Sequence, residues 1–231
     1  MGNRIVKALK NELPHINVNR ILIYCAGMTV LAVGLTLNAK AGLGVSPVFA
    51  VSYSGSKIFG ISLGDAMFVF YTLCIVMQIA VRRMKNYKCD LLQLPFSVVF
   101  SRVMNLFDVV FSYDCAAHSF ASNFVVLLAG VTLTGIGIAA TLNMRLIPNP
   151  ADGAMQALSD ASGVKAGTMK NIFDAGCCAV TAAMCFAAGT EIIGISIGTV
   201  VCISGVGRVI AVVNRFWMDK MLRAAGMDAA R

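Results

Sequence analysis

The sequence predicts an all-α membrane protein with six transmembrane helices and two short half-helices, arranged as two inverted-topology repeats of three transmembrane helices each. The 231 residues are 58% hydrophobic and only 13% charged, with a mean hydropathy of +0.79, whereas soluble domains carry about 25% charged residues. Several apolar stretches reach the roughly 20 residues that a bilayer-spanning helix needs. In addition, a set of residue matches recurs at one fixed offset along the chain.

Six long apolar segments are expected to form the transmembrane helices, because helices satisfy their own backbone hydrogen bonds in lipid. The segments cover approximately residues 21–38, 62–81, 93–112, 122–142, 167–188 and 193–213. Together they predict a single membrane domain over residues 1–231.

Basic residues predict the orientation, because positively charged connections stay on the cytoplasmic side. They concentrate in the N-terminal arm, after the second segment, after the fourth segment and in the tail, whereas the other connections hold only Lys40 and Lys57. The residues concerned are Arg4, Lys7, Lys10, Arg20, Arg82, Arg83, Lys85, Lys88, Arg145, Lys165, Lys170, Arg215, Lys220, Arg223 and Arg231. Both termini are therefore expected to be cytoplasmic. The net charge of +8 reflects this topology, and no nucleic-acid partner is expected.

An internal repeat organises the chain. Pro47 and Pro150 are 103 positions apart (150 minus 47), and several other identities share this offset. They are Ala26-Gly27 with Ala129-Gly130, Gly34 with Gly137, Gly60 with Gly163, Gly64 with Gly167, and Cys74 with Cys177. The copies cover about residues 19–112 and 122–215. Because each copy has three transmembrane helices, the second must enter from the opposite face, as in many transporters and channels.

Each copy also predicts a short helix after its first transmembrane segment. An N-cap residue followed by Pro marks each start and a Gly marks each stop. The starts are Ser46-Pro47 and Asn149-Pro150, and the stops are Gly60 and Gly163. A helix of about 12 residues is about 18 Å long, half a bilayer, so we expect re-entrant half-helices. An amphipathic surface helix is the alternative, because the second segment carries Asp152, Gln156 and Asp160.

Two known motifs are matched only in part. Asn149-Pro150-Ala151 matches the triplet of water channels, but those channels place each half-helix after the second helix of a repeat, and here it follows the first. The stretches Gly60–Gly64 and Gly194–Gly198 match G-x-S-x-G, but a nucleophilic Ser needs a nearby base and neither His lies in an apolar segment. Ser62 and Ser196 are therefore expected to be helix N-caps. We expect no enzyme activity, no cofactor and no metal.

Ionisable residues inside apolar segments are candidates for function, because each costs a few kcal/mol at the bilayer centre unless it is paired or hydrated. Arg102 has Asn105 at i+3, and Asp174 and Arg208 lie in the fifth and sixth segments. A structural ion pair such as Arg102–Asp174 is the alternative. The candidate substrate-binding residues are Ser46, Pro47, Arg102, Asn105, Asn149, Pro150, Asp152, Asp174 and Arg208.

Four stretches of the chain resemble the YczE/YyaS/YitT family of bacterial membrane proteins. They are LNAKAGLGVSP (Leu37–Pro47), GISLGDAMF (Gly60–Phe68), LLQLPFSVVF (Leu91–Phe100) and IGISIGTVVCISGVGRVI (Ile193–Ile210). The resemblance extends from about residue 20 to 213. It implies a duplicated, multi-pass protein of the bacterial cytoplasmic (inner) membrane, and it implies no substrate.

The leading functional interpretation is a small-solute secondary transporter or exporter with its site at the pseudo-two-fold axis. Two alternatives stay open: the substrate-binding membrane subunit of an energy-coupling-factor vitamin transporter, and a non-transporting membrane scaffold or regulator. The expected partners are the lipid bilayer and a small-molecule or ion substrate, and a homodimer is one assembly that this interpretation allows.

The expected substrate is anionic or zwitterionic, such as a carboxylate metabolite. A helix N-terminus carries roughly half a positive charge, so two inward-pointing half-helices form an electropositive locus. Arg102 and Arg208 would add two full charges, whereas Asp174 and Asp152 would supply negative ones. A desolvated Asp174 could also accept a coupling proton.

Overall fold

The computed structural model of the protein describes residues 17–83 and 90–227, and in these ranges it consists of α-helices and one short 3₁₀ turn. The predicted all-α class is confirmed. The elements are α2 (Val18–Lys40), α3 (Pro47–Phe59), α4 (Leu63–Val81), α6 (Gln93–Val110), η2 (Cys115–Ala117), α7 (Phe120–Met144), α8 (Pro150–Ser162), α9 (Ala166–Ala187) and α10 (Ile197–Ala224). Some basic residues that predict the orientation lie outside the described residues: Arg4, Lys7, Lys10, Lys85, Lys88 and Arg231.

Five helices in the described ranges are long and apolar enough to cross a membrane. Four of them are α2, α4, α7 and α10, and the fifth is α6 together with the turn after it, Gln93–Ala117. The helix α9, the predicted sixth crossing, has 22 residues, but Lys170 and Asp174 make its first half polar and it is not among the five. Large apolar side chains such as Leu73 and Val200 are exposed on the outer faces, as lipid contact requires.

The two short helices begin and end where the sequence predicts. α3 and α8 have 13 residues each, and each begins with Pro directly after its N-cap residue. Gly60 and Gly163 end them with φ angles of 64° and 72°, in the left-handed region that glycine tolerates. The predicted caps of two long helices are also confirmed. Ser62 accepts a hydrogen bond from the Asp65 N–H at the start of α4, and Ser196 forms a capping box at the start of α10.

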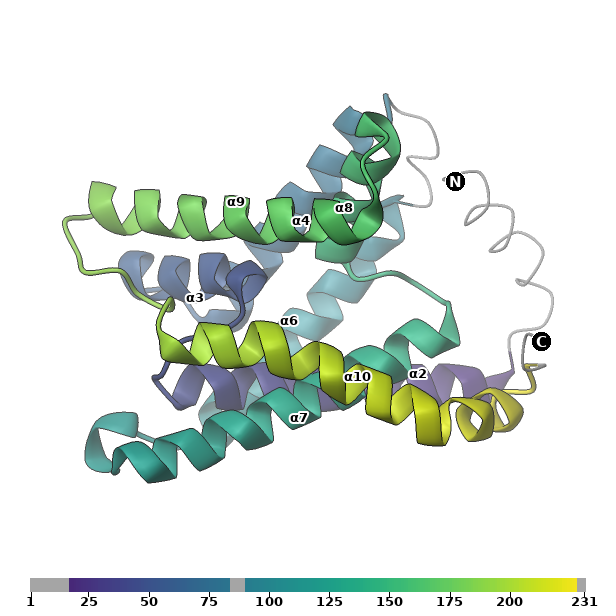
Figure 1. Ribbon diagram of the computed structural model, residues 1–231, viewed down its shortest axis with the longest axis horizontal. Helices are drawn as coiled ribbons and strands as arrows, with labels where there is room; N and C mark the ends of the chain where they lie inside the picture. The colour runs from purple at the N-terminus through teal and green to yellow at the C-terminus, as the bar shows by residue number, and fades with distance from the viewer. Residues whose placement is uncertain (1–16, 84–89, 228–231) are drawn as a thin grey trace.

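The helices α2 and α7 pack closely against each other along the lower side of the molecule in Figure 1. Glycines permit this close approach. A Cβ added to Gly34 would lie 2.4 Å from the backbone N of Thr134, and one added to Gly137 would lie 2.5 Å from the backbone N of Leu31. Small residues commonly serve this purpose in membranes, where van der Waals packing replaces the hydrophobic effect as the force that joins helices.

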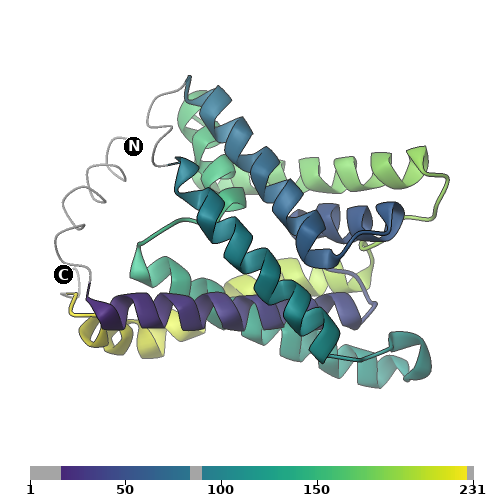
Figure 2. The same ribbon diagram turned by 180° about the vertical axis from the view of Figure 1, so that it is seen from behind.

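The other helices are arranged around this pair. α10 packs on α7, and α6 packs on α4 and also contacts α2. Each short helix lies against a long helix that is distant in the sequence, α3 against α9 and α8 against α4. Figure 1 shows α3 between α9 and α10, and Figure 2 shows α4 and α6 side by side from behind. The start of α8 is therefore enclosed by helices of the first half of the chain.

Replacing Gly34 with Ala is expected to destabilise the protein, because the new methyl group must push α2 and α7 apart. Overpacking of this kind costs about 1–3 kcal/mol in the free energy of unfolding. The loss should appear as a lower melting temperature in detergent, followed by circular dichroism. Gly176→Ala is the matched control, because a Cβ at Gly176 meets no atom within 4 Å and Ala favours the helix. Equal losses in the two variants would contradict the packing explanation.

Candidate functional site

The N-terminus of α8 is fixed to the middle of α4 by a pair of side chains. Asn149 is the N-cap residue, and its Oδ1 accepts a hydrogen bond of 3.0 Å from the Ala151 N–H. Its Nδ2 donates to the hydroxyl oxygen of Tyr71 at 2.9 Å. Tyr71 is fully buried and lies at the middle of the 19-residue α4. The start of α8 is therefore level with the midpoint of a helix that is long enough to cross a membrane.

Two buried glutamines also hold the first turn of α8. Gln78 Nε2 donates both to the Pro150 carbonyl oxygen at 3.0 Å and to Gln93 Oε1 at 3.1 Å. Gln93 Nε2 returns a hydrogen bond of 3.0 Å to Gln78 Oε1. A Cβ on Gly153 would lie 2.5 Å from that same oxygen, so a side chain there would displace the Gln78 amide. These amides join α4, α6 and α8 at one point.

The segment that leads into α8 is bound along α2. Arg20, in the first turn of α2, donates from Nε to the Met144 carbonyl oxygen at 2.8 Å. Tyr24, one turn further along, donates to the Ile147 carbonyl oxygen at 2.9 Å. The chain after α7 therefore runs inward beside α2 before α8 begins. This path gives the non-helical backbone partners within the protein.

Three charged side chains lie beside the first turn of α8. Lys170 Nζ binds both carboxylate oxygens of Asp174, at 2.9 and 3.1 Å, within α9. Asp152 is half-buried, and its carboxylate is attracted by Lys170 and repelled by Asp174. No residue in the described part of the chain gives the Asp152 carboxylate a hydrogen bond or an ion pair. Two carboxylates face one ammonium group, so the cluster carries a formal charge of −1 (one minus two).

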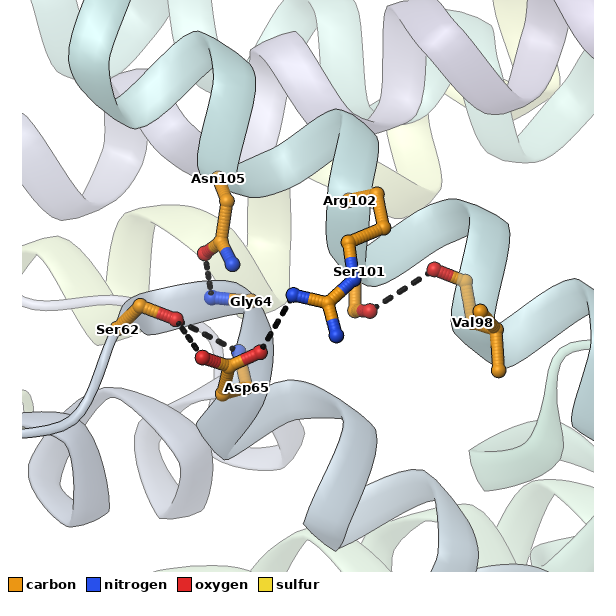
Figure 3. A network of polar contacts seen from close by, with 7 residues as sticks. All are labelled: Ser62, Gly64, Asp65, Val98, Ser101, Arg102 and Asn105. Carbon is orange, nitrogen blue, oxygen red and sulfur yellow. Dashed lines mark hydrogen bonds and ion pairs between the residues drawn. The ribbon is translucent and has the colours of Figure 1, made fainter.

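The predicted residues Arg102 and Asn105 belong to a different network, at the start of α4 (Figure 3). Arg102 Nη1 forms an ion pair of 3.2 Å with Asp65 Oδ1, and its side chain is 70% exposed. Asn105 Oδ1 accepts a hydrogen bond of 2.7 Å from the Gly64 N–H. The Ser62 hydroxyl donates to the other Asp65 oxygen at 2.6 Å. This network joins α6 to the first turn of α4.

The ion pair between Arg102 and Asp174, which the sequence left open as an alternative, does not form, since each residue has another partner. Lys170 lies one turn before Asp174, a spacing that favours a local pair on a helix. Arg208 is exposed on α10 and forms no ion pair with another residue of the described ranges. Ser46 begins α3 without a side-chain hydrogen bond.

Of the predicted site residues, the structure thus brings four together, Asn149, Pro150, Asp152 and Asp174, and places the others elsewhere. Four further side chains complete this cluster and were not predicted as site residues: Tyr71, Gln78, Gln93 and Lys170. Tyr71 and Gln78 are visible in the sequence as polar residues of an apolar segment, and Lys170 by its spacing from Asp174. Gln93 gives no such signal, because it lies at the start of the following apolar segment, 93–112, and not inside it. No group of three or more metal-ligating side chains occurs among the residues that the structure describes.

The fold and its apolar helices define a multi-pass helical membrane protein. The model of a family of unknown function (DUF6198) matches residues 18–215, and the chain belongs to that family. No curated protein and no solved structure matches the chain. The family description does not name the YczE/YyaS/YitT proteins, so the narrower resemblance stays a prediction.

Replacing Gln93 with Leu is expected to lower the free energy of unfolding by about 1–3 kcal/mol, because Gln78 Oε1 then stays buried without a donor. Gln78→Leu should cost at least as much, since it also leaves the Pro150 carbonyl oxygen without its donor. The double variant should lose less than the sum of the two, because the amides serve each other. Melting curves of the four proteins in detergent measure this coupling, and additive losses would show that the amides do not act as a pair.

Proposed function

We propose that this chain is a secondary transporter for a small solute, with its binding site at the N-terminus of α8, between α4 and α9. The position of α8 carries the proposal, because its N-cap residue is bound to the midpoint of α4. Non-helical backbone at membrane depth is tolerated only where protein buries it or where it lines a water-filled cavity. Transporters use helices that start at mid-membrane to bind their substrates. In this proposal α8 is a re-entrant half-helix and α9 is the sixth crossing.

The inverted repeat is part of the same proposal. The short helices start at Pro47 and Pro150, at the offset of 103 (150 minus 47), and have equal lengths. The packing is reciprocal, because α3 of the first half lies on α9 of the second and α8 of the second half lies on α4 of the first. A two-fold axis between the halves produces this exchange of partners. The axis places the two half-helices on opposite sides of the membrane.

The charges at α8 favour a zwitterionic solute. The cluster of Asp152, Lys170 and Asp174 is negative overall, whereas the N-terminus of α8 contributes about half a positive charge. An ammonium group of the solute would pair with Asp152, and its acidic group would face the helix N-terminus. Arg102, which favours an anion in the sequence, is bound to Asp65 and does not contribute to the environment of Asp152. The half-buried carboxylates also offer a place for a coupling proton.

Asp152→Asn is expected to abolish uptake driven by a pH gradient while solute exchange is partly retained, because the amide removes a protonatable group and keeps the shape. Uptake and exchange of zwitterionic metabolites into proteoliposomes measure both activities. Asp160→Asn is the matched control, since Asp160 lies on the same helix but is exposed. A membrane scaffold or regulator would show no flux with any solute. Equal effects of the two substitutions would count against Asp152 as the coupling residue.

Cysteine labelling tests the depth of α8. Asn149 and Asp160 are 11 positions apart (160 minus 149), which is about 16 Å along a helix. A Cys at position 160 should react with a bulky, membrane-impermeant thiol reagent, whereas a Cys at position 149 should react only with small reagents. Both variants need a chain without its reactive native Cys. Rapid labelling of position 149 by the bulky reagent would place α8 on the membrane surface.

A further inference from the structure

The two halves of the chain differ at one equivalent interface. In the first half, α6 packs on α4, whereas in the second half α10 does not pack on α9. Figure 2 shows α4 and α6 side by side, and Figure 1 shows α9 and α10 on opposite sides of α3. α10 lies on α7, as α6 contacts α2, and a Cβ on Gly205 of α10 would be 2.8 Å from Val131 of α7. The contact of α6 with α4 has no such counterpart in the second half.

The contact in the first half requires a glycine. A Cβ on Gly64 would lie 2.1 Å from the carbonyl oxygen of Ser101, so α6 can approach α4 only because Gly64 has no side chain. The Gly64 N–H donates to Asn105 Oδ1 at 2.7 Å, and the ion pair of Asp65 with Arg102 closes the same contact (Figure 3). The close contact with α6 therefore explains why residue 64 is a glycine.

The equivalent glycine in the second half has no such neighbour. Gly167 is the match of Gly64 at the offset of 103 (167 minus 64), and a Cβ there would meet nothing within 4 Å. Glycine is less favourable than alanine in a helix, and at Gly167 no close contact in this conformation offsets that cost. Arg208, the match of Asn105, is exposed, and it has no ion pair within the described ranges. The glycine that would admit a neighbouring helix is therefore present in the second half, but α10 is not packed against it.

We propose that the chain has a second conformation in which α10 closes on α9 at Gly167, as α6 closes on α4 at Gly64 in this one, and in which α6 separates from α4. This inference rests on the inverted repeat of the proposed function. The occupant of the free face of α9 is α10 of the same chain. The present structure is then one of two states. In this state the α4–α6 interface is closed and the α9–α10 interface is open, and in the other state the reverse holds.

The exchange would regulate access to the charged cluster. Asp174 is the match of Tyr71 at the offset of 103 (174 minus 71), and Tyr71 lies against Phe96 and Phe100 of α6. Closure of α10 on α9 would cover Asp174 in the same way. The site at α8 would then be reached along the exposed face of α9 in the present state, and between α4 and α6 in the other. This is the property that alternating access requires.

Two matched cysteine pairs test the exchange. Asp65→Cys with Asn105→Cys spans the closed interface, and Thr168→Cys with Arg208→Cys spans the open one at the same offset, each in a chain whose eight native Cys are replaced. In membranes treated with a short bifunctional thiol reagent, both pairs should cross-link within one chain. A protein with all four cysteines should contain one cross-link or the other, but not both. Cross-linking of the first pair alone would overturn the proposal and indicate that lipid covers the face of α9. Cross-linking of the second pair only between two chains would also overturn it and indicate that a second copy covers that face.

A second measurement keeps the native cysteines. Cys178 is half-buried on α9, whereas its match Ile75 on α4 is 2% exposed, so closure of α10 should protect the Cys178 thiol. Gly167→Leu blocks closure without a clash in the present state, and it should raise the rate of Cys178 alkylation measured by mass spectrometry. Gly176→Leu is the control, because Gly176 also has free space and its match Leu73 is exposed. Equal rates in the wild type and both variants would overturn the inference. Neither measurement uses transport, so absent solute flux would count against the transporter and not against the exchange.

Discussion

A peptide chain that leaves helical geometry at the depth of a membrane must find partners for its N–H and C=O groups within the protein, because lipid offers none. In the proposed arrangement, the segment between α7 and α8 meets this constraint with side chains from two other helices. Arg20 and Tyr24 of α2 bind its carbonyl groups, and Gln78 and Tyr71 of α4 bind the start of α8. These polar residues occupy positions on long apolar helices that would otherwise hold apolar side chains. The polar part of the interior is therefore a consequence of the break in the backbone.

The closely packed pair of α2 and α7 makes this arrangement possible. α2 and α7 approach closely enough for the backbone of one to touch the glycines of the other, at Gly34 and Gly137. Such contacts are short and numerous, and they do not depend on water being expelled. The pair fixes the segment that leads into α8, because the segment begins where α7 ends and α2 binds its carbonyl groups. While α2 and α7 stay packed together, the packing of the other helices can differ between the two halves of the chain.

Local signals in the sequence predict the short helices to the residue, since an N-cap residue, Pro and a final Gly act within a few positions. They also predict half of the cluster at α8, because Asn149 and Asp152 stand out in the start of that helix. The ion pair between α4 and α6 could not be predicted in the same way. Asp65 pairs with Arg102 only because α4 and α6 are packed together, and no spacing along the chain shows that contact. Gln93 was missed for the same reason, since its partner Gln78 is on another helix.

The amide of Gln78 uses its two hydrogens for different partners, one for Gln93 on α6 and one for the Pro150 carbonyl oxygen on α8. Loss of the first bond leaves the second intact. The helices α4 and α8 can therefore travel as one rigid body whether or not α6 accompanies them. Thr181, the residue at the matching place on α9, is too short to act as such a clamp, and its buried hydroxyl has no hydrogen-bond partner in the described residues. The start of α3 therefore lacks the side-chain clamp of α8, and the segment before it is bound by backbone instead: Val45 N–H donates to the Gly194 carbonyl oxygen at 2.9 Å, and Gly198 N–H donates to that of Leu43 at 2.7 Å. Two similar halves of one chain thus attach their short helices by different means, one to the middle of a helix and the other to the beginning of one.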